Sequence, residues 1–551
     1  MVSTFSRRRR MIFAALSSMA IAGISSDAVR AREISELGLQ PVILQTAGAE
    51  EAPIAAEVAE QAEVAAPIAP APISEPYYME QPAVSYAPAP SCNCAAVAKK
   101  KEAAMGKMKK AYAGVFYGND FSYLNDPYYA GPSFFGDHFK NLQTPLGKLD
   151  LGGETRYRYH NERNHRGVGI TGRDDNFWLS RTRLYADWDV CDSVRVYGEV
   201  LNAESMGEQF APRPIEENDF DIQNLFVDLT LFDGAHGKLT TRVGRQELVY
   251  GAQRTISPLD WANTRRTFEG IRGLYQNGDT SIDAFWTNFV PVDPDDADEA
   301  NYDIQFYGAY ATQKNTALGT MEAYWLGSDN SDIGFSYQTV GSRVSGKTDG
   351  GILYDFEGAY QFGEDATAFD HNAGFFTGGL GRKIETNFLS PTVWFYYDWA
   401  SGEDDFDQVG RADGGYDHLY PLAHKYNGFM DLFGRRNLHD INVFTLTPLT
   451  KKVSMILWYH YFRLDQATTP YSVVMTPYET TNAAGSKDLG SEIDLLFNIN
   501  LNARNNVLIG YSHFAGGDYY KETTLNPKVG RDDLNGDYDA DFFYFQYTTR
   551  Y

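Results

Sequence analysis

The sequence predicts an all-β fold: a transmembrane, antiparallel β-barrel of about 18 strands that follows a disordered or poorly defined N-terminal extension. Three observations predict it. The chain ends on a strictly alternating run in which Phe543, Phe545, Tyr547 and Tyr551 share one face. Similar period-2 runs recur along the chain from residue 148. The connections between these runs alternate between tight turns and long loops, an asymmetry typical of outer-membrane barrels.

The final run fits the strand that closes such a barrel. Its interleaved residues, Tyr544, Gln546, Thr548 and Arg550, would face a wet interior while the aromatic set faces lipid. A closed barrel is the only β-architecture that leaves no unpaired backbone groups in the membrane. A soluble β-sandwich also alternates, so the sorting of turns and loops favours the barrel.

Composition excludes a bundle of membrane-spanning helices. The mean hydropathy is −0.41, and only one long apolar stretch occurs, near the N-terminus. A helical span needs about 20 apolar residues. Aromatic residues reach 14% of the chain, an excess that fits the aromatic girdles of a barrel. A Tyr-rich soluble β-protein is the alternative explanation of this excess.

Residues 1–31 have the pattern of a signal peptide. The arginines Arg7–Arg10 precede an apolar stretch, Met11–Ile24, and a cleavage site follows at Ala28 or Ala31. The segment carries five arginines and one aspartate, so its removal changes the formal charge from −25 to −29. We therefore expect a cell outer-membrane location, no nucleic-acid partner, and an acidic surface that attracts divalent cations.

Two segments separate the signal peptide from the predicted barrel. Residues 32–98 are rich in Ala, Pro and Glu, and are predicted to form a disordered periplasmic segment. Residues 99–147 form an N-terminal extension, with a short basic helix over Lys99–Lys110 and an aromatic stretch over 111–146. Three roles are open for the aromatic stretch: packing at the barrel mouth, plugging the barrel, or binding the cell wall.

The barrel is predicted for residues 148–551. In its first strand Leu151 and Tyr157 fall on one face, and Arg156 and Arg158 on the other. This puts apolar groups toward lipid and charges toward a lumen, which stays an aqueous channel at roughly 16–18 strands. The candidate strands are 148–160, 177–190, 193–203, 221–231, 239–248, 266–275, 279–289, 303–312, 317–327, 335–345, 350–362, 371–383, 387–399, 437–447, 451–463, 488–499, 505–515 and 539–551.

Three long motifs occur within the predicted barrel. The longest, from Arg242 to Arg272, contains RVGRQELVYGAQR, WAN and RTFEGIR. The others are GFMDLFG at 428–434, with Asn437-Leu438, and LGSEIDL at 489–495. These motifs resemble the alginate-export family of outer-membrane porins, and the resemblance covers about residues 148–551. It implies a barrel of about 18 strands whose arginine-lined lumen passes an anionic polysaccharide, such as alginate, out of the cell without an energy source.

A uronate polymer carries one carboxylate per sugar, and arginine suits it because the guanidinium fork matches a carboxylate and keeps its charge. Several weak cationic sites in series let the polymer enter and leave. Strand alternation, the family motifs and the longest loop nominate the candidate substrate-binding residues. These are Arg156, Arg158, Arg181, Arg183, Arg195, Arg242, Arg245, Arg254, Arg265, Arg266, Arg272, Arg435 and Arg436. The alternative for any one of them is a structural pair in the barrel wall with Glu154, Asp187, Glu199 or Glu247.

No catalytic motif is present, so we expect no enzyme activity and no cofactor. A barrel lipase would need a serine beside a histidine such as His439 or His460. Acidic loops at Asp293–Glu299, Glu403–Asp407 and Arg531–Asp537 are candidates for Ca²⁺, with ordinary solvated loops as the alternative, and no metal site is assigned.

The leading hypothesis is a passive outer-membrane anion channel for an anionic polysaccharide or oligosaccharide. A general diffusion porin for small solutes and a structural or adhesive outer-membrane protein are the alternatives. The expected partners are outer-membrane lipid and lipopolysaccharide, the anionic polysaccharide, the barrel assembly machinery, and the cell wall or periplasmic export partners.

Overall fold

The computed structural model describes residues 94–551 except for residue 168 and the stretches 367–369, 387–388, 404–413, 479–484 and 523–536. The predicted signal peptide lies outside the described residues, as do nearly all of segment 32–98 and most of the acidic loops Glu403–Asp407 and Arg531–Asp537. The elements outside the barrel are α2 (Cys94–Lys109), η3 (Phe116–Gly118), η4 (Ser122–Asn125), η5 (Asp137–Phe139), β1 (Leu142–Thr144), η7 (Ala423–Lys425) and α3 (Asp518–Glu522).

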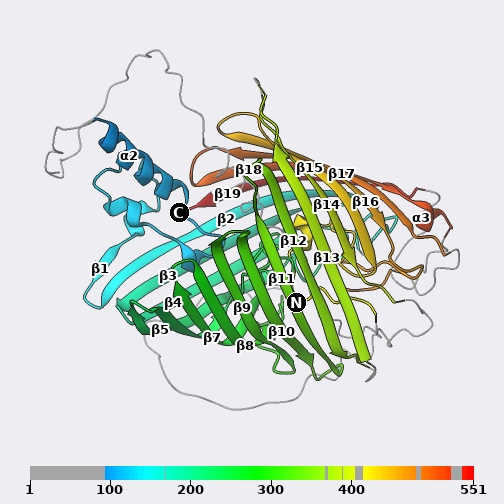
Figure 1. The fold of residues 1–551 in the computed structure, drawn as a ribbon, viewed down its shortest axis with the longest axis horizontal. Helices are drawn as coiled ribbons and strands as arrows, with labels where there is room; N and C mark the ends of the chain where they lie inside the picture. Colours follow the sequence, from blue (N-terminus) through cyan, green and yellow to red (C-terminus); the bar gives the residue numbers. More distant parts are fainter. Residues whose placement is uncertain are drawn as a thin grey trace, which may run out of the picture. The chain divides into compact units, whose positions relative to one another are not determined.

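Eighteen strands of the described chain, β2 to β19, form one closed antiparallel sheet in sequence order (Figure 1). All 18 predicted strands are confirmed. Their bounds are β2 Gly147–Arg163, β3 Asp175–Cys191, β4 Val194–Met206, β5 Asn218–Gly234, β6 Gly237–Gln246, β7 Thr267–Asn277, β8 Thr280–Val290, β9 Ile304–Thr316, β10 Gly319–Asn330, β11 Phe335–Lys347, β12 Ile352–Glu364, β13 Asp370–Lys383, β14 Thr392–Ala400, β15 Leu438–Pro448, β16 Val453–Arg463, β17 Asp488–Asn500, β18 Asn505–Gly516 and β19 Ala540–Arg550.

The last strand closes the barrel against the first, as the C-terminal alternation predicts. In the β19–β2 ladder, Tyr547 lies opposite Tyr157 and Gln546 opposite Arg158. The C-terminal residue continues this pairing. The amide of Tyr551 donates to the carbonyl of Gly153 at 2.9 Å, and the amide of Gly153 donates to the carbonyl of Tyr551 at 2.8 Å.

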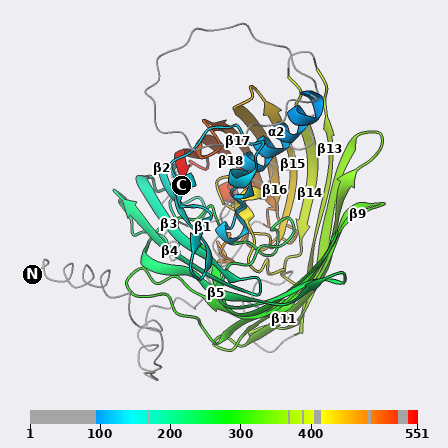
Figure 2. The same ribbon diagram turned by 90° about the vertical axis from the view of Figure 1, so that its left-hand side faces the viewer.

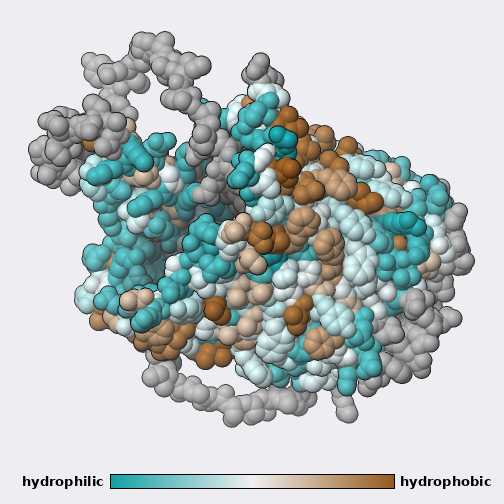
Figure 3. Space-filling view, in the orientation of Figure 1, coloured by the Kyte–Doolittle hydropathy of each residue, from teal (hydrophilic) through white to brown (hydrophobic). Residues whose placement is uncertain are grey.

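The two faces of the sheet differ as the alternation requires. Tyr157, Leu184 and Phe395 are exposed on the outer face, whereas inward residues such as Glu154 and Arg156 are only 2% exposed. Figure 3 shows hydrophobic side chains across the outer wall, with hydrophilic residues gathered toward its ends. Among the described helices, none combines the length and apolar character needed to span a membrane.

Two long loops fold into the lumen instead of extending outward. The β6–β7 loop contributes Ile256 to a cluster with the wall residues Phe268 and Phe306. The β14–β15 loop contributes Phe433 to a second cluster with wall residues that include Phe462. Apolar loop residues therefore pack against aromatic residues of the inner wall and narrow the channel.

The N-terminal extension lies at the end of the barrel that carries the short turns. Figure 2, which faces that end, shows α2 in front of the strands. The carbonyl of Met108 in α2 accepts a hydrogen bond at 3.5 Å from Arg504, in the β17–β18 turn. Residues 94–98 already belong to α2, although the sequence analysis predicts disorder to residue 98. Alanine at three of these five positions favours the helix.

Candidate functional site in the lumen

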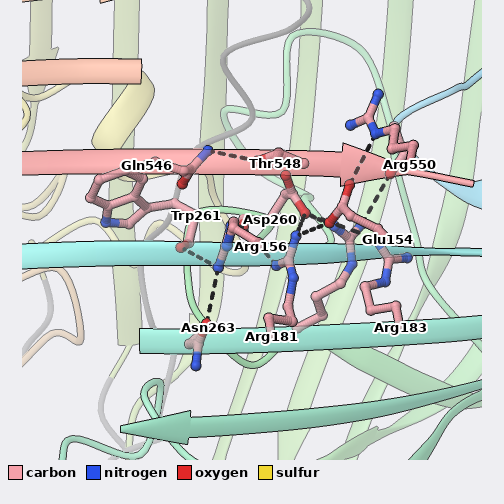
Figure 4. Close-up of polar contacts among 12 residues, drawn as sticks. Glu154, Arg156, Arg181, Arg183, Asp260, Trp261, Asn263, Gln546, Thr548 and Arg550 are labelled. Carbon is pink, nitrogen blue, oxygen red and sulfur yellow. Dashed lines mark hydrogen bonds and ion pairs between the residues drawn. The ribbon is translucent and has the colours of Figure 1, made fainter. Parts of the chain in front are cut away.

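One group of candidate arginines lines the inner wall at β2 and β3. Arg156 and Arg158 come from β2, Arg181 and Arg183 come from β3, and all four are almost fully buried. Figure 4 shows Arg156, Arg181 and Arg183 pointing toward the inward loop around Asp260, and Arg158 contacts the same loop at Trp261. Residues two apart in a strand share a face, so the alternation of this sequence places all four on the same side of the sheet.

The backbone of the β6–β7 loop is held by three of these arginines, and Arg181 Nη1 donates to the carbonyls of Asp260 at 3.0 Å and Ala262 at 3.1 Å. Arg156 Nη2 donates to the carbonyl of Ala262 at 2.6 Å, and Arg158 Nη1 donates to the carbonyl of Trp261 at 2.8 Å. The Arg158 guanidinium also lies 3.5 Å from the centre of the Trp261 ring. These three cations therefore fix the loop inside the barrel.

Asp260 brings a carboxylate into the same group of arginines. Its Oδ1 accepts a hydrogen bond from Arg181 Nη2 at 2.8 Å and also contacts Arg265. Burial by itself raises the pKa of Asp260, but the positive charges of Arg181, Arg265 and Arg156 outweigh burial and hold the pKa well below its usual range. Asp260 is therefore ionised and offsets part of the local positive charge.

The four acids named as wall partners all pair with candidate arginines. The pairs are Arg181–Glu154 at 2.8 Å, Arg183–Glu199 at 2.6 Å, Arg195–Asp187 at 2.5 Å and Arg265–Glu247. Nearly every member of these pairs is deeply buried, and removing one partner of such a pair leaves an uncompensated charge. The structural alternative thus describes the geometry of these four arginines.

Most of the other candidates are paired as well. The contacts are Arg242–Asp228 at 2.7 Å, Arg254–Asp355 at 2.8 Å, Arg254–Glu357 at 2.9 Å, Arg272–Asp283 at 2.5 Å, Arg435–Asp398 at 3.3 Å and Arg436–Glu403. Arg266 donates to the carbonyls of Ser257 and Pro421 at 3.3 and 3.4 Å. These acids are not among the partners predicted from the sequence, although counting inward positions along the strands identifies Asp228, Asp283 and Asp355.

The expectation that Arg245 lines the lumen is wrong, because this residue faces outward. It pairs across the sheet with Leu225, which is 50% exposed on the outer face. Its guanidinium donates to the carbonyl of Asp298 at 2.8 Å and contacts Glu269. Arg242 faces the lumen, and a residue three positions further along a regular strand falls on the opposite face.

The aromatic stretch of the N-terminal extension enters the lumen beside the arginines of β3–β6. The Phe116 ring lies 4.0 Å from the Arg183 guanidinium, and the Tyr117 ring lies 4.4 Å from that of Arg242. The carbonyl of Tyr117 accepts from Arg195 at 2.6 Å, and its hydroxyl donates to the carbonyl of Glu247 at 2.8 Å. Of the three roles left open, these contacts match a plug.

The opposite half of the lumen holds a cavity of about 460 Å³. Its wall comes from inward residues of β9–β12 and β14–β16, and loop residues including Arg254, Lys425 and Tyr426 line its other side. Lys314 and Asn315 near the end of β9 and Gly319 at the start of β10 also line it, so the cavity reaches the short-turn end of the barrel. The arginines of β2 to β6 are not part of its lining.

This chain is similar to several known outer-membrane proteins. A family model described as alginate export matches residues 147–528. No curated protein matches the chain. The outer membrane protein OpdK of Pseudomonas aeruginosa is 11% identical, with a TM-score of 0.49 over 73% of this chain and 98% of that one. OccAB1 of Acinetobacter baumannii is 11% identical, with a TM-score of 0.49 over 75% and 99% of the two chains.

A closed barrel with an apolar outer face and a charged interior defines an integral outer-membrane protein of the porin type. The match spans more than half of the sequence and agrees with the resemblance of its motifs. The chain belongs to the alginate export family. It forms a passive outer-membrane channel.

Proposed function

We propose that this channel passes an anionic polysaccharide or oligosaccharide, such as a uronate polymer. The observation that carries the proposal is the density of guanidinium groups inside the barrel: every nominated arginine except Arg245 faces the lumen or lies in a loop folded into it. These positive groups attract a polyanion along the wall, one weak site after another, without displacing the acids that hold them.

A general diffusion porin is the second candidate, and the ion pairs favour it. Arg183 is held by Glu199 and Arg242 by Asp228, so the field along the channel is weaker than the number of arginines implies. A pore with balanced charge would pass small solutes with little selectivity.

The contacts of His460 support a function without catalysis. Its Nδ1 lies 2.8 Å from Asp440, and its Nε2 lies 3.7 Å from Asp494. The ring is therefore engaged by two carboxylates, whereas a barrel lipase needs the ring nitrogen beside a serine hydroxyl.

Single-channel recording of the full-length protein in planar bilayers tests the proposal. We expect an anion-selective reversal potential in a salt gradient and current block by uronate oligomers. Weak selectivity without block would support the general porin and reject the polysaccharide channel.

A further inference from the structure

The cavity on the β9–β16 side has the size and chemistry of a saccharide site. Small-molecule pockets range from roughly 300 to 1,000 Å³ and combine apolar walls with a few polar groups, and this cavity measures about 460 Å³. Many of its lining residues already bind one another, so only the remaining ones are available to a ligand.

An aromatic strip forms the apolar part of its wall. Trp394, Phe444 and Trp458 lie side by side on three adjacent strands, since the first two are register partners and the last two are as well. Tyr396 stacks on Trp394 with 5.3 Å between ring centres. Aromatic faces of this kind pack against the C–H faces of a pyranose ring.

The arginines of the cavity are not available. Arg254 bonds Asp355 at 2.8 Å, and Arg343 bonds both Asp355, at 2.7 Å, and Glu322, at 3.1 Å. Recruiting either guanidinium for a ligand would strip a buried carboxylate of its partner, which is costly. The charged groups in this part of the wall therefore bind one another and are not available to a ligand.

Lys425 differs from these arginines. It lines the cavity and is only 7% exposed, yet no carboxylate of the described chain lies within ion-pair distance of its ammonium. Its ammonium lies over the ring of Tyr426, whose centre is 5.2 Å from Nζ. A buried ammonium without a counter-ion is costly, and inside a membrane protein such a charge marks a substrate path.

We propose that this cavity binds a uronate unit of the transported saccharide, with Lys425 pairing with the sugar carboxylate and the Trp394–Tyr396 strip packing against the ring. The inference rests on the proposed function and adds the position of the charge-selective contact. That contact is this lysine, whereas the arginines of β2–β6 are occupied by acids, by the β6–β7 loop and by the N-terminal plug.

Block of single-channel current by a uronate tetramer and by a neutral tetrasaccharide, each added from the short-turn side, tests the assignment. Lys425→Gln should weaken uronate block about tenfold, as expected for the loss of one charge-assisted hydrogen bond, and leave neutral block unchanged. Lys425→Arg should restore uronate block. Trp394→Leu should weaken the block by both sugars.

Two further variants make the outcome decisive. Lys451→Gln removes an exposed lysine from a short turn and should change neither block. If the Lys425→Gln variant loses the heat-dependent shift in gel migration that marks a folded barrel, Lys425→Met takes its place. Unchanged uronate block in a folded, neutral Lys425 variant overturns the Lys425 assignment and leaves the polysaccharide channel standing. A wild-type channel that no uronate blocks rejects both.

Discussion

Arg181 Nη2 lies 2.8 Å from Oε1 of Glu154, although these two residues are not register partners. Glu154 lies opposite Arg183 in the β2–β3 ladder, and Arg183 bonds Glu199 on the next strand instead. The arginines of the wall thus reach sideways to acids on neighbouring strands. This network of ion pairs links adjacent strands and reduces the positive field along the lumen.

The network of ion pairs predicts that removing one of its acids makes the channel more anion-selective and the barrel less stable. Glu199→Gln takes the carboxylate from Arg183, whose other acidic contact among the described residues, Asp260, is 4.0 Å away. Breaking a buried pair costs about 3–5 kcal/mol. Reversal potentials and urea unfolding midpoints measure the two effects. The control is Asp233→Asn, in an exposed pair with Lys238, and equal behaviour of both variants would contradict the prediction.

The plug predicts a wider pore when its aromatic residues are removed. Replacing Phe116 and Tyr117 together by alanine should raise single-channel conductance on the order of twofold, since conductance follows the open cross-section. Phe135→Ala is the matched control, because that side chain is 80% exposed. A conductance equal to that of the wild type would show that these two side chains do not limit the current.

The closing seam predicts sensitivity at the C-terminus. Deleting Tyr551 removes both backbone hydrogen bonds to Gly153, and Phe545→Asp places a charge on the lipid-facing side. A lipid-facing Arg or Lys costs roughly 2–4 kcal/mol at mid-depth, and Asp costs less. We expect less heat-modifiable barrel in membranes for both variants and a normal yield for Phe545→Leu. Normal yields for all three would refute the prediction.

The sorting of turns and loops predicts the orientation of the barrel. An epitope inserted at Asp295–Asp296, in the exposed β8–β9 loop, should be labelled on intact cells. One inserted at 348–351, in the turn between β11 and β12, should be labelled only after the outer membrane is opened. Labelling of the second site on intact cells would reverse the assigned orientation.

Strand positions could be predicted from the sequence because alternation is a local property. The inward placement of Arg156 and Arg158 follows from period 2 alone, and the pairing of the last strand with the first follows because a barrel must close. Alternation also excludes Arg245 from the face that holds Arg242, whereas the family motif nominates both arginines.

The contents of the lumen could not be predicted in the same way. Trp261 packs on Arg158, and Phe116 on Arg183, across about a hundred and about seventy residues of sequence. Loops carry no periodic signal that indicates which wall they will meet. The buried lysine of the cavity, Lys425, lies in such a loop, so its lack of an acidic partner among the described residues becomes visible only in three dimensions.

The reversal potential of the wild-type channel in a salt gradient tests the central claim most directly. The surface is acidic, with a formal charge of −25 for the chain, but exposed charges more than about 8–10 Å from the pore are screened at physiological salt. We predict an anion-selective reversal potential, together with block by uronate oligomers. A cation-selective channel that uronate oligomers do not block would contradict the account.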